Sequence, residues 1–480
     1  MRAIRLGSLL LPALLTGCAL TPPPSEVDAP APAQWAAPLP GDAAALPHHA
    51  RLSDLSQWWQ QQNDPLLVEL IDAAQLVSPT VASAVSRIEQ SRATSVNANA
   101  ALGPKLDLNA SVNRTNAQQP LPLGTTSQVE LQPSWEADLF GGNRATSAAA
   151  RARLQGAQAG WHDARVSVAA EVANRYYDLR TCDKLVIVTR ADADSRAETA
   201  RLSALSAQAG FEAPANAALA RASAAEGNSR VTQQRAQCDL DIKALVALTA
   251  IDEATLRQKM AAGEATPPSF APIAIDTLPA QTLAQRPDVF IAEREVAAAS
   301  AEVGNAQAQR YPRLTLSGSI GIANFRSQGV STNLDTWAIG PLALSLPIFD
   351  GGARVANIGA AEARYNEAVV KYRSTVRQAV REVEEALVNL QSAATRSDDA
   401  RVAVEGYDIA FKGTESRYRN GLASLIELED TRRQRLAAEL NAASLERDRM
   451  AAWIALYRAA GGGWRRSAST AASSATTNNQ

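Results

Sequence analysis

Hydrophobic and polar residues alternate strictly in two stretches of the first half of the chain. Leu106, Leu108 and Val112 stand between polar residues, and the same order recurs shortly afterwards. Such alternation predicts two β-strands with one apolar face, over about residues 104–115 and 126–140. Each is long enough, when tilted, to cross a bilayer. A soluble antiparallel sheet with one buried face gives the same pattern, so the alternation leaves both interpretations open.

The second half of the chain repeats this pattern more weakly. Leu314, Leu316 and Ile320 share one face of a strand expected over about residues 312–325. A partner strand is expected over about 334–346, where both faces are apolar.

Two stretches that lack proline predict unusually long helices, from about 143 to 209 and from about 353 to 420. Each covers roughly 100 Å at 1.5 Å per residue. Apolar residues recur every seven positions, as at Val376, Val383 and Leu390, which favours supercoiling against a partner helix.

Both predicted helices reverse at a glycine, which predicts helical hairpins over about 143–249 and 353–460. The turns are Gly210-Phe211 and Gly421-Leu422-Ala423, because glycine accepts the left-handed conformation that ends a helix.

Two cysteines lie at equal distances from the first turn. Cys182 is 28 residues before Gly210 and Cys238 is 28 residues after it. In an antiparallel hairpin they therefore reach the same height, which favours a disulfide in an oxidising compartment. Two buried free thiols are the alternative.

The two halves are copies of one unit. Residues 103–112 resemble residues 311–320, and Leu139–Arg144 resembles Phe349–Arg354, at offsets of 208 and 210. The chain is therefore expected to be an internal duplication. Its predicted parts are a signal peptide (1–17), a lipidated tether (18–50), a first repeat (51–250), an equatorial linker region (251–286), a second repeat (287–464) and a disordered tail (465–480).

The amino terminus resembles a bacterial lipoprotein signal. Arg2 and Arg5 precede a short apolar run that ends in Leu15-Thr16-Gly17-Cys18. This resemblance to the lipobox implies that Cys18 carries the lipid anchor, and Ala19 points to the outer membrane. An ordinary secretory signal with an incidental cysteine is the alternative.

Composition excludes several classes of function. The net charge of −2 provides no excess of basic residues for binding nucleic acid. The three histidines, His48, His49 and His162, form no metal or catalytic constellation, and the Gly-Gly pairs lack the lysine of a phosphate-binding loop. No enzyme activity, metal or cofactor is expected. No run of about twenty apolar residues follows the signal, so a membrane crossing is expected as a barrel.

Four strands from one chain cannot close a barrel, so several copies are expected. Three segments then resemble the outer membrane factors, the TolC-like lipoproteins of the NodT/OprM type. They are Leu-Pro-Ile-Phe-Asp-Gly-Gly at 346–352, Tyr-Arg-Asn-Gly at 418–421 with Ser424-Leu425, and the stretch 456–464 ending in Gly-Gly-Gly-Trp. With the repeat, the resemblance covers about residues 50–464.

This resemblance implies a mixed α and β membrane protein that is a homotrimer. Four strands per chain, twelve in total, would form a β-barrel in outer-membrane lipid, continued by a long α-helical barrel. The function implied is a passive efflux duct that docks a periplasmic adaptor and an inner-membrane pump. The alternatives are the exit duct of a type I protein secretion system and a non-channel coiled-coil lipoprotein.

The resemblance also implies a periplasmic gate beside the second turn. Ile426 and Asp430 share a helix face there, with Glu427 nearby, and the family constricts its mouth with an apolar and an Asp ring at the matching positions. Tyr418, with either Arg417 or Arg419, resembles the family's lock between helices. The alternative is a solvated face on which Glu429 pairs with Arg433. The residues expected to dock an adaptor are Gly210, Phe211, Gly421, Leu422 and Ala423.

Overall fold

The computed structural model describes two compact units of the chain. The described residues are 20–37, 58–62, 64–116, 123–262, 279–464 and 466. The units comprise residues Met1–Ala29, Val85–Gly160 and Phe290–Thr375, and residues Pro30–Ala84, Trp161–Val289 and Val376–Gln480. The predicted signal peptide and Cys18 lie outside the described residues, as does the predicted tail apart from residue 466.

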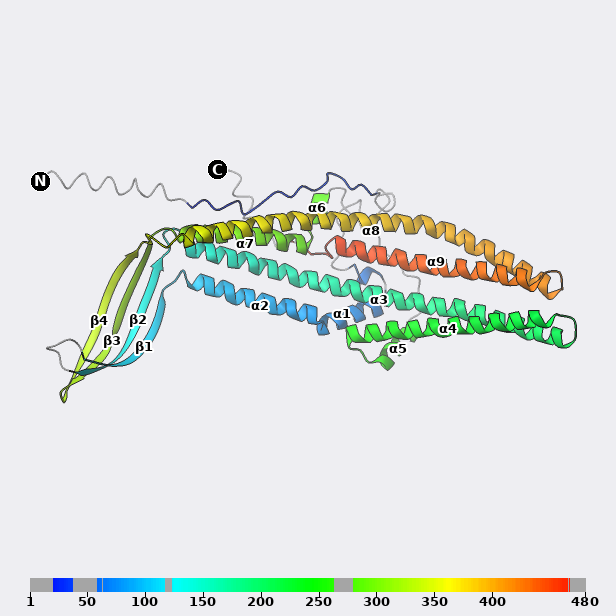
Figure 1. Cartoon of the computed structure of the whole chain (residues 1–480), viewed down its shortest axis with the longest axis horizontal. Helices are drawn as coiled ribbons and strands as arrows, with labels where there is room; N and C mark the ends of the chain where they lie inside the picture. Colours follow the sequence, from blue (N-terminus) through cyan, green and yellow to red (C-terminus); the bar gives the residue numbers. More distant parts are fainter. Residues whose placement is uncertain are drawn as a thin grey trace. The chain divides into compact units, whose positions relative to one another are not determined.

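The first unit contains an antiparallel sheet of four strands in the order β1-β2-β3-β4 (Figure 1). The strands are β1 (Lys105–Thr115), β2 (Gly124–Ala137), β3 (Arg313–Ser327) and β4 (Val330–Ser345). Their bounds coincide with the predicted ranges within a few residues. The largest difference at a strand start is in β4, which begins four residues earlier than the pattern suggested.

The apolar face of this sheet is exposed in the chain. Leu108 pairs with Leu131, Leu131 with Ile320, and Ile320 with Trp337, so apolar residues form a row across all four strands. Leu108, Ile320 and Trp337 are 68%, 61% and 74% exposed. A soluble sheet packs its apolar face against a core, and no described element does so here.

The helices of the first unit pack through small residues. Helix α2 (Pro79–Ala100) precedes β1, and α7 (Pro287–Ala308) precedes β3. Ala149 and Ala152 bury themselves against Ala298 of α7, while a second cluster gathers around Val296, Val303, Ala361 and Tyr365. Alanine at such contacts lets long helices approach closely and costs little side-chain entropy.

The second unit contains most of two antiparallel helical hairpins, whose longer helices begin in the first unit (Figure 1). Helices α3 (Gly142–Gln208) and α4 (Pro214–Thr249) form the first hairpin, and α8 (Ala353–Arg419) and α9 (Leu425–Ala459) form the second. Their shared core includes the largest fully buried side chains. The stacked rings of Trp58 and Tyr457 lie 4.9 Å apart at its edge.

Shorter helices complete the second unit. Helix α1 (Pro65–Val77) begins at Asp64, whose side chain accepts a hydrogen bond from the amide of Leu67. The Ser78-Pro79 sequence separates it from α2, as proline cannot continue a helix interior. The 3₁₀ helix η2 (Gln60–Gln62) precedes α1, and α5 (Glu253–Ala262) and α6 (Pro279–Ala284) fall within residues 251–286.

Among the described residues, no single helix has the length and hydropathy of a membrane span. The bent pair of α1 and α2, with 50° between its two helices, meets these criteria by length and composition alone.

The described part of the predicted tether is bound to the body of the protein. In the first unit, Ser300 Oγ and the Tyr365 hydroxyl donate hydrogen bonds to the carbonyls of Pro23 and Pro24, at 2.5 and 2.9 Å. In the second unit, the backbone amides of Ala36 and Ala37 donate to the carboxylate of Glu384, at 2.6 and 2.7 Å. The extended conformation was predictable from its prolines, but this docking was not.

Candidate functional site

The two hairpin turns close with the same backbone geometry. In the first, the amide of Phe211 donates to the carbonyl of Ser206 and Gly210 donates to Ala207. In the second, Leu422 donates to Arg417 and Gly421 to Tyr418. Both glycines have a positive φ, 79° and 74°. Each turn is therefore a Schellman motif, which only the left-handed residue makes possible.

The helices that leave the two turns begin differently. Helix α4 starts at Pro214 and has no side-chain cap, because its N-cap residue is Ala213. Helix α9 starts with a capping box: the Glu427 amide donates to Ser424 Oγ, and the Ser424 amide donates to the Glu427 carboxylate. The backbone hydrogen bond from Ser424 lowers the pKa of Glu427. The carboxylate of Glu427, which the sequence assigned to the gate, thus serves the helix start.

Apolar side chains are exposed at both turns. Phe211 is 88% exposed, and Ile426 in the first turn of α9 is 72% exposed. Asp430 lies four residues after Ile426 on the same face, where its carboxylate accepts hydrogen bonds from Arg433 at 2.5 Å and from Gln434 at 3.1 Å. The pair of Glu429 with Arg433, which the alternative interpretation of this face assumed, does not form, because Arg433 binds Asp430.

Glu429 instead points into a buried ion-pair network that joins the two hairpins. Its carboxylate binds the guanidinium of Arg196 on α3 at 2.6 Å and accepts a hydrogen bond from Ser223 on α4 at 2.8 Å. Arg196 also binds Asp192 one turn earlier, at 2.8 Å. Glu429 thus contacts both helices of the first hairpin.

Arg432 extends this network along α9. Only 2% of its surface is exposed; it pairs with Glu429 and donates to Ser195 and Thr199 of α3 at 3.1 and 2.9 Å. Burial lowers the pKa of Arg432, while the charge of Glu429 opposes this shift. We call Asp192, Arg196, Ser223, Glu429 and Arg432 the cross-hairpin network.

The predicted lock residues behave differently from each other. The Tyr418 hydroxyl lies 2.9 Å from Ser203 Oγ and so joins α8 to α3. Arg419 forms its ion pair with Glu415 on its own helix, at 3.1 Å. Arg417 donates to the carbonyl of Leu422 and closes the turn.

The structure joins Cys182 of α3 and Cys238 of α4 in a disulfide, with their Cα atoms 5.5 Å apart. Both cysteines are buried in the main core cluster. The bond lies within the first hairpin, and the sequence separation that it closes is 56 residues.

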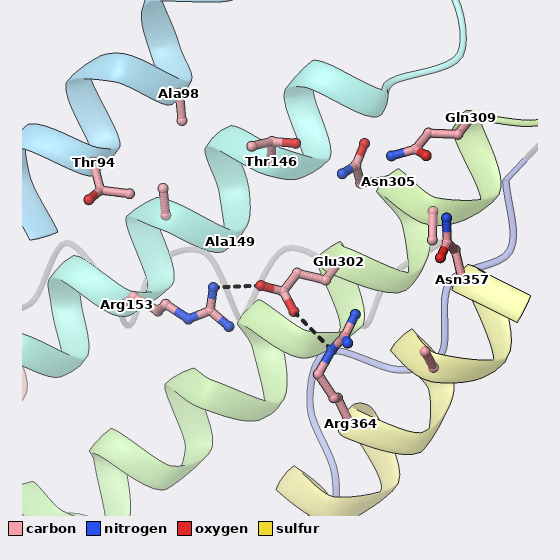
Figure 2. A pocket seen from close by; sticks show the side chains of 13 residues that line it. Thr94, Ala98, Thr146, Ala149, Arg153, Glu302, Asn305, Gln309, Asn357 and Arg364 are labelled. Atoms are coloured by element: carbon pink, nitrogen blue, oxygen red, sulfur yellow. Dashed lines mark hydrogen bonds and ion pairs between the residues drawn. The ribbon is translucent and has the colours of Figure 1, made fainter. Parts of the chain in front are cut away.

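A cavity of about 590 Å³ lies in the first unit, with lining residues from α2, α3, α7 and α8 (Figure 2). Arg153 projects toward Glu302 and binds it at 2.5 Å, while Arg364 approaches the other oxygen of Glu302 at 4.0 Å. A second carboxylate, Glu295, lies 2.9 Å from Arg153. These carboxylates raise the pKa of Arg153, so its charge is permanent and locally balanced. Among the described residues, no group of three or more His, Cys, Asp or Glu side chains is placed to hold a metal ion, in this cavity or elsewhere.

The family model described as "Outer membrane efflux protein" matches residues 70–250 and 278–462. The chain belongs to the outer membrane efflux protein family. One matched range falls in each half of the sequence. Together the ranges include all four strands and both hairpins, so the family covers the sheet, the turns and the cross-hairpin network.

Similar proteins span nearly the full length of the chain. Nodulation protein T of Rhizobium leguminosarum bv. viciae is 28% identical over 447 residues, covering 92% of this chain and 90% of that protein. The solvent efflux pump outer membrane protein SrpC of Pseudomonas putida is 28% identical, with coverage of 93% and 96%. The solved outer-membrane channel OprN is 26% identical with a TM-score of 0.79, covering 93% of this chain and 100% of that one.

These likenesses place the protein in the outer membrane as an efflux protein. They include channels and efflux components, and no catalytic family is among them.

The sequence pattern did not predict the cross-hairpin network of this efflux protein. Glu429 and Arg196 are 233 residues apart in the chain, and helical periodicity says nothing about such distant partners. A signal was present, however. Arg432 lies at helical spacing between Leu428 and Leu436 on the buried face of α9, and buried charges need partners.

Proposed function

We propose that this protein is the homotrimeric outer-membrane exit duct of a tripartite efflux system. The observation that carries the proposal is the exposed apolar face of the four-stranded sheet. An apolar surface of that extent is costly in water and favourable in lipid.

The trimer follows from the edges of the sheet. Strands β1 and β4 each have one neighbour, so their outer backbone groups lack partners within the sheet. In lipid these groups must be satisfied, and pairing β1 of one copy with β4 of the next does so. Three copies would supply twelve strands, and the long hairpins would continue the barrel as a helical duct.

The lipid anchor and the disulfide belong to the same proposal. We expect Cys18 to be acylated and to hold the amino terminus in the outer membrane. We expect the Cys182–Cys238 bond to persist in the oxidising periplasm.

Efflux is favoured over protein secretion as the transport task. Relatives such as SrpC are described as outer membrane proteins of solvent efflux pumps. The partners expected on this basis are an inner-membrane pump, which supplies the energy, and a periplasmic adaptor. Exposed Phe211 and Leu422 at the two turns are suited to an apolar adaptor contact.

The gate is proposed at the second turn, on Ile426 and Asp430. Ile426 is exposed and has no cover within the chain, as a residue facing a narrow mouth would be. Three Asp430 side chains around one axis would attract cations. The ion pair of Asp430 with Arg433 is exposed. It weakens this attraction of cations only slightly, since surface pairs contribute little.

Planar-bilayer recordings of the purified trimer test both parts of the proposal. We expect stable channels, and we expect Ile426→Ala with Asp430→Ala to raise the single-channel conductance. Leu219→Ala, in the uncapped first hairpin, is the matched control and should leave conductance unchanged. A lack of channels would contradict the duct, whereas unchanged conductance in the double variant would contradict the gate alone.

A further inference from the structure

One carboxylate lies in the middle of the polar face of the sheet, which also carries Asp107 in the next cross-strand row and Glu136 nearer the end of β2. Glu130 of β2 lies opposite Asn109 of β1 and Gly321 of β3, and Gly321 lies opposite Thr336 of β4. This cross-strand row contains no cation. No ion pair involves Glu130 among the described residues.

A chain of amides holds this carboxylate in place. Asn109 Nδ2 donates to Gln132 Oε1 at 2.7 Å, and Gln132 Nε2 donates in turn to Glu130 Oε1. Gln128 Nε2 approaches the same oxygen at 3.5 Å. All three amides lie on the polar face, and the hydrogen bonds from Gln132 and Gln128 hold the Glu130 carboxylate in place.

The strand next to Glu130 keeps the space beside it free of side chains. A Cβ atom at Gly321 would lie 2.2 Å from the Val129 carbonyl oxygen and 2.7 Å from Glu130 Cα. Only glycine permits this approach of β2 and β3. No side chain from β3 therefore covers the carboxylate in its own row.

We propose that Glu130 sets the charge selectivity of the sheet-lined section of the duct and makes it prefer cations. This inference rests on the proposed function, in which the polar face of the sheet borders the lumen. Three copies would place three fixed carboxylates at one level, and a ring of this kind attracts cations into a pore.

The sheet offers a matched control of the same charge on the opposite face. Asp335 of β4 pairs with Ile322, which pairs with Val129, so Asp335 shares the apolar face. Successive residues of a strand point to opposite sides. Removing the charge of Asp335 therefore leaves the lumen unchanged, whereas removing that of Glu130 does not.

The test is the reversal potential of the trimer in a bilayer under a KCl gradient. Glu130→Gln should reduce the permeability ratio of K⁺ to Cl⁻ by about twofold or more. Asp335→Asn should leave it unchanged. Gln128→Glu, which adds a carboxylate next to Glu130 on the polar face, should raise the ratio and provides an independent test if Glu130→Gln does not assemble.

Equal ratios in the unmodified and Glu130→Gln channels would overturn the inference while leaving the duct intact. A loss of selectivity in Asp335→Asn would overturn it as well, because the two faces would then be exchanged. Absence of any conductance in the unmodified protein would instead remove the duct, and this inference with it.

Discussion

The two helical hairpins share one backbone design and differ in what stabilises them. Both turn through a Schellman motif at glycine, at Gly210 and at Gly421. The first hairpin is closed by the Cys182–Cys238 disulfide, but its returning helix starts without a side-chain cap. The second has a capping box and lacks a disulfide.

The positions that match the two cysteines, 211 residues later in the chain, are Ala393 and Arg449. The second hairpin is instead held to the first through Glu429. A covalent bond persists through a conformational change, whereas ion pairs can exchange partners. We infer that the second hairpin is the one that moves when the duct opens.

The largest expected effect comes from removing the disulfide. Cys182→Ser with Cys238→Ser should destabilise the first hairpin by about 4 kcal/mol, because the bond closes a sequence separation of 56 residues. Thermal unfolding followed by circular dichroism measures the loss, and the reduced unmodified protein should unfold with the double variant. Two thiols that react under denaturing, non-reducing conditions would show that the disulfide does not form. The two hairpins would then not differ by a covalent bond.

The cross-hairpin network should give the next largest effect. Glu429→Ala leaves Arg196 and Arg432 buried beside each other without their shared carboxylate. We expect a loss of about 3 kcal/mol, toward the lower end for a broken buried pair because Glu429 keeps some exposure to solvent. The variant should also raise the single-channel conductance, although the proposed gate residues Ile426 and Asp430 are unchanged.

Arg433→Ala is the control for this prediction, because Arg433 is an exposed member of an ion pair on the same helix. Its removal should change stability by less than about 0.5 kcal/mol. If Glu429→Ala and Arg433→Ala lose the same stability, the buried ion pairs of α9 contribute no more than its exposed ones. If Glu429→Ala loses stability with unchanged conductance, the network is structural and takes no part in opening.

Local pattern was sufficient to predict most of the fold. The alternation of apolar and polar residues predicted β1 and β2, and the absence of proline predicted α3 and α8. These elements follow the periods of two and about 3.6 residues that local patterns reveal. The start of β4 was missed because its first residues are polar. There Asn324 Nδ2 donates hydrogen bonds across the strands to Ser331 Oγ and to Asn333 Oδ1. Gln328 and Gly329 alone form the turn, where the pattern had suggested a longer loop.

The site was less predictable, because its contacts join residues far apart in the chain. The glycines predicted both turns. The equal spacing of the two cysteines from the first turn predicted their disulfide. Glu427 was assigned to a gate although Ser424 three residues earlier already signalled a capping box. The sequence suggested Arg433 as the partner of Glu429, but the partners in the structure are Arg432, on the same helix, and Arg196 of α3, which are both buried.

The smallest effect should come from exchanging the helix starts. Ser424→Ala removes the N-cap of α9 and should cost about 1 kcal/mol. Ala213 has the extended backbone of an N-cap residue, with φ −67° and ψ 136°. Ala213→Ser should therefore stabilise α4, by about 0.5 kcal/mol. Shifts of opposite sign in the thermal midpoint would show that the hairpins differ in their caps independently of the disulfide and the network. Shifts of the same sign would mean that the contacts of the turn in the assembled trimer, rather than the capping hydrogen bonds, decide the stability of each tip.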